Sequence, residues 1–443
     1  MKLTRLKIDK YRRVLPGTEL FFDDGLNVLL GRNGTGKTTL LKLLSMCVRS
    51  NFEELAREEF AFDYDFQFDE AIVQVRLANR RRETHAVTSG STGDRPIRAR
   101  AEHETFEYDA TIEIRLLASQ RIYRLRATPS ASQLEVVGTS TPARAIDAFS
   151  LFTDNLVFIA FTRLHDLAPT EAREEAQAIE AVWGWAATLD DAHRFDESLA
   201  VFRAMEGRPT DDMRSDPPIA LLQLSRRTGE RFILSERSFV PWEIIQNLMA
   251  NADNSDGFND TTLRHDELGF LRRFVNAVGL NSAEMKVALL KRDVGDETED
   301  LLIGDFKVLL HFKDGSIIAH DLLSYGQKRL LAFLYYVDCN EDVIIADEIV
   351  NGLHHEWIDA CLDALEARQA FLTSQNPLLL DYLSFESVEQ AEKCFIVCRT
   401  ELHNGREHMR WANITKGEAE AFYRGYLAGI QHVSELLRTE GLW

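Results

Sequence analysis

The sequence has no uninterrupted apolar run that approaches the roughly 18 residues of a membrane-spanning helix. Its first residues, MKLTRLKIDKYRR, alternate polar and apolar side chains and lack the apolar stretch of a signal peptide. We therefore expect a cytoplasmic protein that does not associate with a membrane.

Cysteine is scarce and shows no framework spacing. The chain has five cysteines. Only Cys394 and Cys398 lie close together in sequence, and they are too few ligands for a zinc site. We expect reduced thiols rather than disulfides, as in cytoplasmic proteins.

A surface that is basic all round is also excluded, because the net charge is −20. Local basic clusters still occur at Arg80–Arg82 and at Arg95, Arg98 and Arg100. Two interpretations remain open for them: solvated charges in a loop between strands, or contacts to DNA.

The chain has enough apolar residues for a large core, since 45% of its 443 residues are hydrophobic. Residues 1–30 predict two strands, LTRLKI and ELFFDDGLNVLL, and period-two alternation between about 70 and 137 predicts antiparallel strands. Residues 170–290 are mostly helical in pattern, and strands return from 285. We divide the chain into an N-terminal lobe (1–165), a helical insertion (166–284) and a C-terminal lobe (285–443).

The strongest motif is GRNGTGKTT, which fits G-x-x-x-x-G-K-[ST] with Gly31, Gly36, Lys37 and Thr38. A phosphate chain needs several backbone N–H groups aimed at one point, and the glycines allow that conformation. A strand precedes the motif and a helix follows it, which favours a phosphate loop over a merely structural glycine turn. It predicts ATP and Mg²⁺ as ligands, with Lys37 reaching the β and γ phosphates and Thr38 binding the metal. The residues predicted to bind the phosphates are Gly31, Asn33, Gly34, Thr35, Gly36, Lys37, Thr38 and Thr39.

A second motif is DVIIADE, in which two carboxylates follow a short apolar run. The pattern places Asp347 and Glu348 at the carboxyl edge of a buried strand. In P-loop enzymes the first carboxylate holds Mg²⁺, and a neighbouring one can orient and deprotonate the attacking water. The sequence therefore predicts Asp347 as a metal ligand and Glu348 as a catalytic base.

A third motif, LLSYGQKRLL, reads as the start of a helix with Ser324 as the N-cap. The order of the three motifs resembles that of ABC-type ATPases of the SMC, Rad50 and RecF branch. Residues Val350–His355 further resemble the ENGLHP-like stretch of single-chain bacterial members. The resemblance covers roughly residues 1–165 and 285–400 and implies an α/β P-loop NTPase fold of ABC-ATPase type, with an antiparallel β subdomain and a helical insertion.

The same resemblance implies a head-to-tail dimer, or a higher homo-oligomer, with ATP sandwiched between subunits. The signature residues would then face the partner's γ phosphate, and Asn351–Leu353 would lie at the dimer interface. Tyr325 replaces a glycine of the family pattern, which adds bulk near that phosphate. The signature residues are Ser324, Tyr325, Gly326 and Gln327.

The stretch FLTSQNPLLL (371–380) corresponds to the family's switch segment, and Gln375 stands where a histidine is usual. Glutamine can donate and accept hydrogen bonds but cannot exchange a proton as histidine does. We therefore expect Gln375 to be a catalytic residue of a slow ATPase. The alternative is that Gln375 merely caps the helix that begins at Pro377.

The C-terminal stretch predicts one helix with an apolar stripe and a C-cap at Gly441. Its stripe is either ordinary core or a surface for an oligomer or partner. The stripe consists of Phe422, Tyr426, Ile430, Val433 and Leu437.

Function is the least constrained expectation. The chain lacks the acidic nuclease module of OLD-type relatives and resembles the stand-alone ATPases of PARIS- and Septu-type anti-phage systems. That resemblance implies a sensor that controls a separate effector nuclease, with DNA or a phage-encoded molecule as trigger. A RecF-like DNA repair ATPase is the alternative, and a transporter motor fits less well because such motors lack an insertion of this size.

Overall fold

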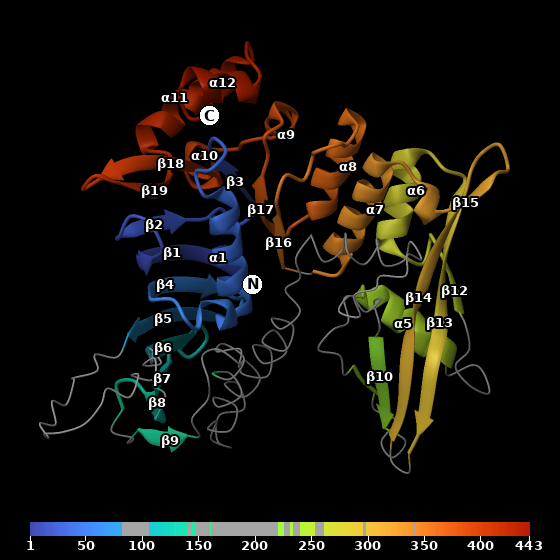
Figure 1. The fold of residues 1–443 in the computed structure, drawn as a ribbon, viewed down its shortest axis with the longest axis horizontal. Helices are drawn as coiled ribbons and strands as arrows, with labels where there is room; N and C mark the ends of the chain where they lie inside the picture. Colours follow the sequence, from blue (N-terminus) through green and yellow to red (C-terminus); the bar gives the residue numbers. More distant parts are fainter. Residues whose placement is uncertain are drawn as a thin grey trace, which may run out of the picture. The chain divides into compact units, whose positions relative to one another are not determined.

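The computed structural model describes residues 1–81, 106–128, 130–139, 143–146, 160, 220–225, 231–233, 240–252, 261–295, 298–340 and 342–443. The chain forms two compact units, each assembled from separated segments of sequence (Figure 1). Unit 1 consists of Met1–Asp24, Leu30–Asp190 and Glu392–Lys416, and unit 2 of Gly25–Leu29, Asp191–Ala391 and Gly417–Trp443.

Unit 1 contains an eight-stranded antiparallel sheet in the order β2-β1-β4-β5-β6-β7-β8-β9. This confirms the antiparallel strands predicted from alternation between 70 and 137, which are β5 to β8. The strands are β1 (Lys2–Tyr11), β2 (Thr18–Phe21), β4 (Phe60–Gln67), β5 (Ala71–Arg81), β6 (Phe106–Leu116), β7 (Ile122–Thr128), β8 (Ala131–Val136) and β9 (Arg144–Ile146). Of the basic clusters, Arg80 and Arg81 end β5, and the others lie outside the described residues.

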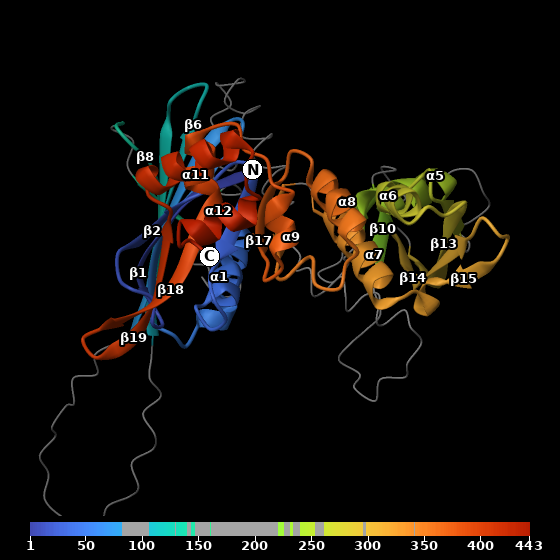
Figure 2. The same ribbon diagram turned by 90° about the horizontal axis from the view of Figure 1, so that it is seen from above.

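The helix α1 (Lys37–Arg49) runs along this sheet (Figure 2). Strand β4 alternates so that Phe60, Phe62, Tyr64 and Phe66 are all buried on one face. The Tyr64 hydroxyl lies 3.3 Å from the Ser50 hydroxyl, just past the end of α1. The aromatic face of β4 therefore supports the C-terminal end of the helix; a short 3₁₀ turn, η1 (Glu53–Leu55), follows it.

The second predicted N-terminal strand, ELFFDDGLNVLL, was wrong in one respect, because the structure divides it into β2 and β3 (Leu26–Leu30). The break contains Asp23, Asp24 and Gly25, residue types that favour turns over strands. The two strands also have different partners: β2 pairs with β1, and β3 pairs with β17 (Gln369–Thr373).

Unit 1 is completed by a hairpin of β18 (Phe395–His403) and β19 (Arg406–Asn413). Its two turn residues, Asn404 and Gly405, have φ of 52° and 75°, as a tight hairpin turn requires. The side chain of Asn413 pairs with both backbone groups of Phe21 at 2.8 Å, and so joins β19 to β2.

In unit 2, β16 (Val343–Ala346), β17 and β3 pair in parallel. Parallel strands buried on both faces read as continuous apolar runs, as β16 and β17 do. The helices of this unit are α5 (Trp242–Ala252), α6 (Gly269–Val278), α7 (Tyr325–Asp338), α8 (His355–Leu365) and α9 (Pro377–Asp381), with a 3₁₀ turn, η3 (His320–Leu322). A further helix, α10 (Val388–Cys394), leads into β18.

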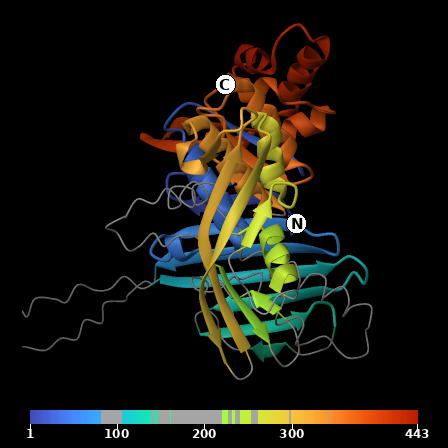
Figure 3. The ribbon, with the colours of Figure 1, turned by 90° about the vertical axis from the view of Figure 1, so that its right-hand side faces the viewer.

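Unit 2 also has a second sheet in the order β11-β10-β14-β13-β12, with β15 pairing to β14 (Figure 3). Its strands are β10 (Ala220–Ser225), β11 (Arg231–Ile233), β12 (Thr261–Arg264), β13 (Ser282–Val294), β14 (Thr298–His311) and β15 (Ile317–Ala319). The description of 166–284 as helical is therefore incomplete, since its described residues include β10, β11 and β12 besides α5 and α6. These strands are only three to six residues long, too short for their alternation to be distinguished from the helical pattern of the segments around them.

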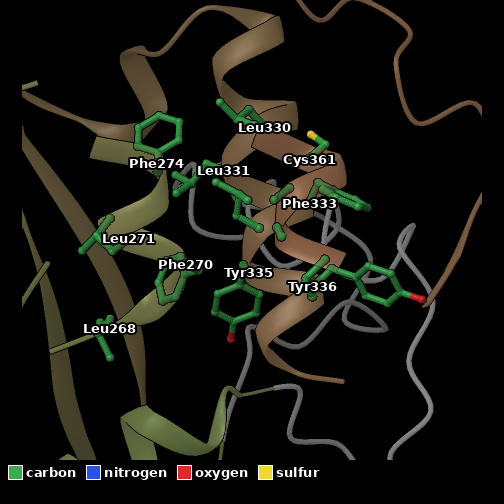
Figure 4. Packing of buried hydrophobic residues seen from close by; sticks show 14 of the residues in the cluster. Leu268, Phe270, Leu271, Phe274, Leu330, Leu331, Phe333, Tyr335, Tyr336 and Cys361 are labelled. Carbon is green, nitrogen blue, oxygen red and sulfur yellow. The ribbon is translucent and has the colours of Figure 1, made fainter. Parts of the chain in front are cut away.

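The core of unit 2 lies where α6, α7 and α8 meet (Figure 4). Phe270 of α6 meets Tyr335 of α7 edge to face, with ring centroids 5.2 Å apart. Almost every residue from Leu330 to Val337 is fully buried, so α7 is covered on all sides. This burial fixes the helix that carries the LLSYGQKRLL motif.

The single C-terminal helix predicted from the apolar stripe was wrong. The structure has α11 (Lys416–Ala428) and α12 (Val433–Thr439), separated at Gly429, which has φ of 64°. Phe422 and Tyr426 pack against Phe385, while Ile430 lies between the helices and is 87% exposed. Gly441, at φ of 68°, does end the last helix as predicted.

All five cysteines are free in the structure, in agreement with the expectation of thiols. Among the described residues, no helix has the length and apolar character needed to cross a membrane.

Candidate functional site

The predicted phosphate loop lies in unit 1, between β3 and α1. Gly34 and Gly36 have φ of 82° and 90°, and Gly31 has φ of 147°, conformations that L side chains rarely adopt. A Cβ at Gly31 would collide with the Cys398 carbonyl and lie 2.9 Å from the Thr35 hydroxyl. All three glycines are therefore required by conformation, and Gly31 and Gly36 also by close packing.

Lys37 is buried and its ammonium lies inside the loop. The Nζ donates hydrogen bonds to the carbonyls of Gly31 at 2.7 Å and Arg32 at 3.1 Å. Burial raises the pKa of the nearby Cys398 thiol to about 12, while the Lys37 charge lowers it. The Cys398 thiol therefore stays neutral beside the loop.

The outer face of the loop is open to solvent. Asn33, Gly34 and Thr38 are exposed, and Thr39 is half-buried. No side chain caps the N-terminal end of α1, which begins at Lys37. Exposed backbone donors, a positive helix end and a buried ammonium suit a phosphate chain.

The acidic pair lies in unit 2, directly after β16. Because Ala346 pairs with Leu372 in a parallel register, Asp347 lies beside Thr373 at the same edge. The Thr373 hydroxyl donates to the Asp347 carboxylate and accepts a 2.8 Å bond from the Glu348 N–H. One buried hydroxyl therefore fixes the side chain of Asp347 and the backbone of Glu348.

Both carboxylate oxygens of Glu348 are engaged by side-chain amides. Asn351 donates to one oxygen and Gln375 donates to the other. Glu348 has φ of 50°, a left-handed conformation that costs about 1–2 kcal/mol for a residue with a side chain. The structure thus brings together Glu348 and Gln375, two residues that the sequence analysis assigned separately to catalysis.

The alternative in which Gln375 caps the Pro377 helix is wrong. The cap of α9 is Asn376, whose side chain accepts a 3.0 Å bond from the Leu378 N–H. Gln375 turns away from the helix and toward Glu348.

The signature segment begins α7 with Ser324 as the predicted N-cap. Ser324 and Gln327 form a capping box: the Ser324 hydroxyl accepts from the Gln327 N–H, and the Gln327 side chain accepts from the Ser324 N–H at 3.0 Å. Tyr325 is 67% exposed. Gln327 is therefore occupied in capping, while Tyr325 projects into solvent.

Gly326 of the signature lies against the stretch that follows the acidic pair. A Cβ at Gly326 would collide with the Gly352 carbonyl and lie 3.3 Å from the Trp357 ring. Gly352 in turn has φ of 80°, and a Cβ there would lie 2.7 Å from the Tyr325 ring. The two glycines allow the segment 351–353 to pack on the first turn of α7.

Two residues that the sequence did not single out hold α7 to the acidic pair. Arg329, buried in α7, donates to the carbonyl of Glu348 at 2.6 Å and to that of Ile349 at 3.2 Å. Tyr336 uses its hydroxyl to donate to the Ile345 carbonyl and to accept from the Ile345 N–H. No signal in the sequence separates Arg329 from its basic neighbour Lys328, and none singles out Tyr336.

We predict that Gly36→Ala weakens ATP binding at least about tenfold, because the side chain would be strained at positive φ and crowded by Met409 and Trp411. Calorimetric titration with Mg-ATP would measure this. Gly17→Ala is the matched control, since Gly17 has a similar φ of 79° with open space around it. Equal affinity in the Gly36 variant and the control would contradict the prediction.

We predict that Thr373→Val reduces ATP turnover about tenfold and raises the Mg²⁺ concentration needed for it. The substitution keeps the shape but leaves the Asp347 carboxylate and the Glu348 N–H without the hydroxyl, a loss of about 1–3 kcal/mol per buried group. Thr373→Ser should retain activity. A Val variant with the Mg²⁺ dependence of the unaltered protein would disprove this role.

Comparison with known families covers the phosphate loop and the acidic pair by separate models. A model of an AAA domain matches residues 5–137, which include the phosphate loop. A second model, described as "AAA domain, putative AbiEii toxin, Type IV TA system", matches residues 212–381, which include the signature, the acidic pair and the switch segment. No curated protein matches the chain.

Solved structures similar to the chain include heads of SMC proteins. The SMC head domain from Thermotoga maritima is 8% identical, with 94% of this chain and 100% of that chain covered and a TM-score of 0.39. An SMC head bound to the C-terminal domain of ScpA, derived from Pyrococcus furiosus, is 12% identical, with 96% and 99% covered and a TM-score of 0.38. The matches to AAA-domain models and the strand–loop–helix geometry show that the chain has an α/β P-loop NTPase fold.

Proposed function

We propose that the chain is an ABC-type ATPase that binds ATP and hydrolyses it slowly. Lys37 and the loop from Gly31 to Thr39 bind the phosphates. Thr38 and Asp347 would hold Mg²⁺, which when bound neutralises charge on the β and γ phosphates. Residues 1–165 and 285–443 are the two lobes of this ATPase in our proposal, with 166–284 inserted between them.

The proposal of slow hydrolysis rests on one observation: both carboxylate oxygens of Glu348 accept hydrogen bonds from side-chain amides. A catalytic base must present a free carboxylate oxygen to the attacking water. Here Asn351 donates to one oxygen and Gln375 to the other, so each oxygen keeps only one acceptor site and the attacking water must compete with the amides for the base. Gln375 can position Glu348 and the γ phosphate but cannot exchange a proton, which limits the rate further.

We also propose that the active form is a head-to-tail dimer, or a higher homo-oligomer built on it. The support is the signature segment, whose exposed Ser324 and Tyr325 lie at the N-terminal end of α7. A helix N-terminus favours an anion, so a partner subunit's γ phosphate is a suitable ligand for this end. Slow hydrolysis would make the ATP-bound dimer long-lived.

The biological role that we propose is a switch in a bacterial anti-phage system, acting in the cytoplasm on a separate effector nuclease. It rests on the sequence resemblance to PARIS- and Septu-type ATPases. The description of the model that matches residues 212–381 names a type IV TA system, which is compatible with an ATPase that works with a second protein. DNA or a phage-encoded molecule is the proposed trigger.

We expect turnover below about 1 s⁻¹, the lower end of the range typical of enzymes. Glu348→Gln should abolish it, because the amide cannot accept a proton. Gln375→Ala should slow it about tenfold, because the loss of positioning of Glu348 and the γ phosphate outweighs the acceptor site freed on Glu348, and Gln375→His should raise it about tenfold by supplying a group that can exchange a proton. Phosphate release under saturating Mg-ATP measures all three.

Gln390→Ala is the matched control for this series. Its side chain accepts a bond from the Glu386 N–H at the start of α10, so it should leave turnover unchanged. Fast hydrolysis that is indifferent to Gln375→Ala would contradict both the slow rate and the role of Gln375.

The partner proposal predicts that the protein elutes as a dimer or larger with ATP and co-purifies with the product of the adjacent gene. Light scattering after size exclusion, with and without ATP, measures the first, and the Glu348→Gln variant should hold the dimer longest. No stable partner together with no effect on phage infection would contradict the defence role and leave the ATPase proposal standing.

A further inference from the structure

One cross-strand pair of the β18–β19 hairpin contacts both ends of the phosphate loop. Cys398 and Trp411 are partners in the antiparallel register. The Cys398 carbonyl lies directly against Gly31, at the start of the loop, and the Trp411 ring lies against Gly36, at its end. The hairpin lies in unit 1 with the loop and comes from the far end of the sequence.

Trp411 makes a directional contact as well as a packing one. Its side chain is 2% exposed, and its indole N–H donates to the Thr35 carbonyl at 3.2 Å. In a trans peptide the C=O of one residue and the N–H of the next point in opposite directions. Holding the Thr35 carbonyl toward the indole therefore aims the Gly36 N–H away from the hairpin.

The strand that carries Trp411 is itself fixed next to the loop. The backbone of Met409 donates to the Arg13 carbonyl at 2.7 Å and accepts from the Leu15 N–H at 2.9 Å. Its side chain lies under Gly36, where a Cβ would collide with its sulfur. The loop therefore has a floor made of one backbone carbonyl, one thioether and one indole.

We propose that Trp411 is a positioning residue for phosphate binding: it fixes the Thr35–Gly36 peptide so that the Gly36 N–H faces the bound nucleotide. The inference rests on the proposed function, since it assigns Trp411 to the same ATP site. Gly34 and Gly36 flank Thr35 and loosen this part of the loop, and a preorganised donor binds an anion more tightly than one that must be ordered on binding. Trp411 supplies that order without touching the ligand.

The test is Trp411→Phe, which keeps an aromatic ring and removes the N–H donor. Calorimetric titration with Mg-ATP should show a dissociation constant raised about tenfold with an unchanged number of sites, the loss expected for one net hydrogen bond. Turnover at saturating ATP should change less than about twofold. ATP should alter the tryptophan fluorescence of the unaltered protein, and this change should be lost in the variant.

Trp443→Phe is the control. Trp443 lies under the Arg438 guanidinium, 4.6 Å from it, so its loss should leave ATP affinity and the fluorescence change intact. A Trp411 variant that binds with unchanged affinity overturns the inference and leaves the proposed function standing. A Trp411 variant that binds Mg-ATP at fewer sites per chain but with unchanged affinity also overturns the inference. That result indicates that Trp411 only stabilises the folded protein. An unaltered protein that binds no Mg-ATP overturns the proposed function and this inference together.

A second variant keeps the inference testable should Trp411→Phe fail to fold. Met409→Ala removes the half-buried thioether under Gly36 and keeps the indole. It should raise the dissociation constant about threefold or more, because the Gly36 peptide gains freedom. Unchanged affinity in this variant overturns the inference that the floor of the loop orders the phosphate donors.

Discussion

The parallel register of β16 on β17 is the constraint on which the arrangement of the acidic pair depends. Ala346 pairs with Leu372, so the next residue of each strand, Asp347 and Thr373, must emerge side by side. A shift of one residue would move Thr373 away from both acidic residues and turn the side chains to the other face. The hydroxyl that bridges Asp347 and the Glu348 N–H exists only in this register.

Helix α7 holds that arrangement in place. Arg329 donates to the carbonyls of the turn that follows β16, which stabilises Glu348 in a left-handed conformation that would otherwise be unfavourable. The same helix begins with the signature, and Gly326 touches Gly352, next to the Asn351 that donates to Glu348. Because these contacts are close-packed, a shift of the first turn of α7 cannot occur without moving Asn351, and hence the hydrogen bonding of Glu348.

Local patterns predicted much of this structure. The strand and helix that flank the glycine loop, the strand that ends at the acidic pair, the N-cap at Ser324 and the proline at the start of α9 each follow from a few adjacent residues, and the structure confirms each of these elements. The errors came where local pattern was extended too far. One continuous strand was read through Asp23–Gly25, and one continuous helix was read through Gly429, because both segments keep their apolar period across the break. The assignment of Gln375 to the catalytic residues required the family resemblance, since the local sequence was also compatible with a helix cap, and its contact with Glu348 was not predicted.

The contacts that order the site could not be predicted in the same way, because they join residues far apart in sequence. Trp411 reaches Thr35 across 376 residues, and nothing local to either residue indicates the pairing. Yet a loop with three glycines at positive φ gains conformational freedom from each of them, and that freedom opposes binding. The glycines of the motif therefore permit several conformations of the loop. The contacts with the β18–β19 hairpin select one of them. The Asn404–Gly405 turn, which gives the hairpin its register, thus contributes to the phosphate site although it lies at the other end of both strands.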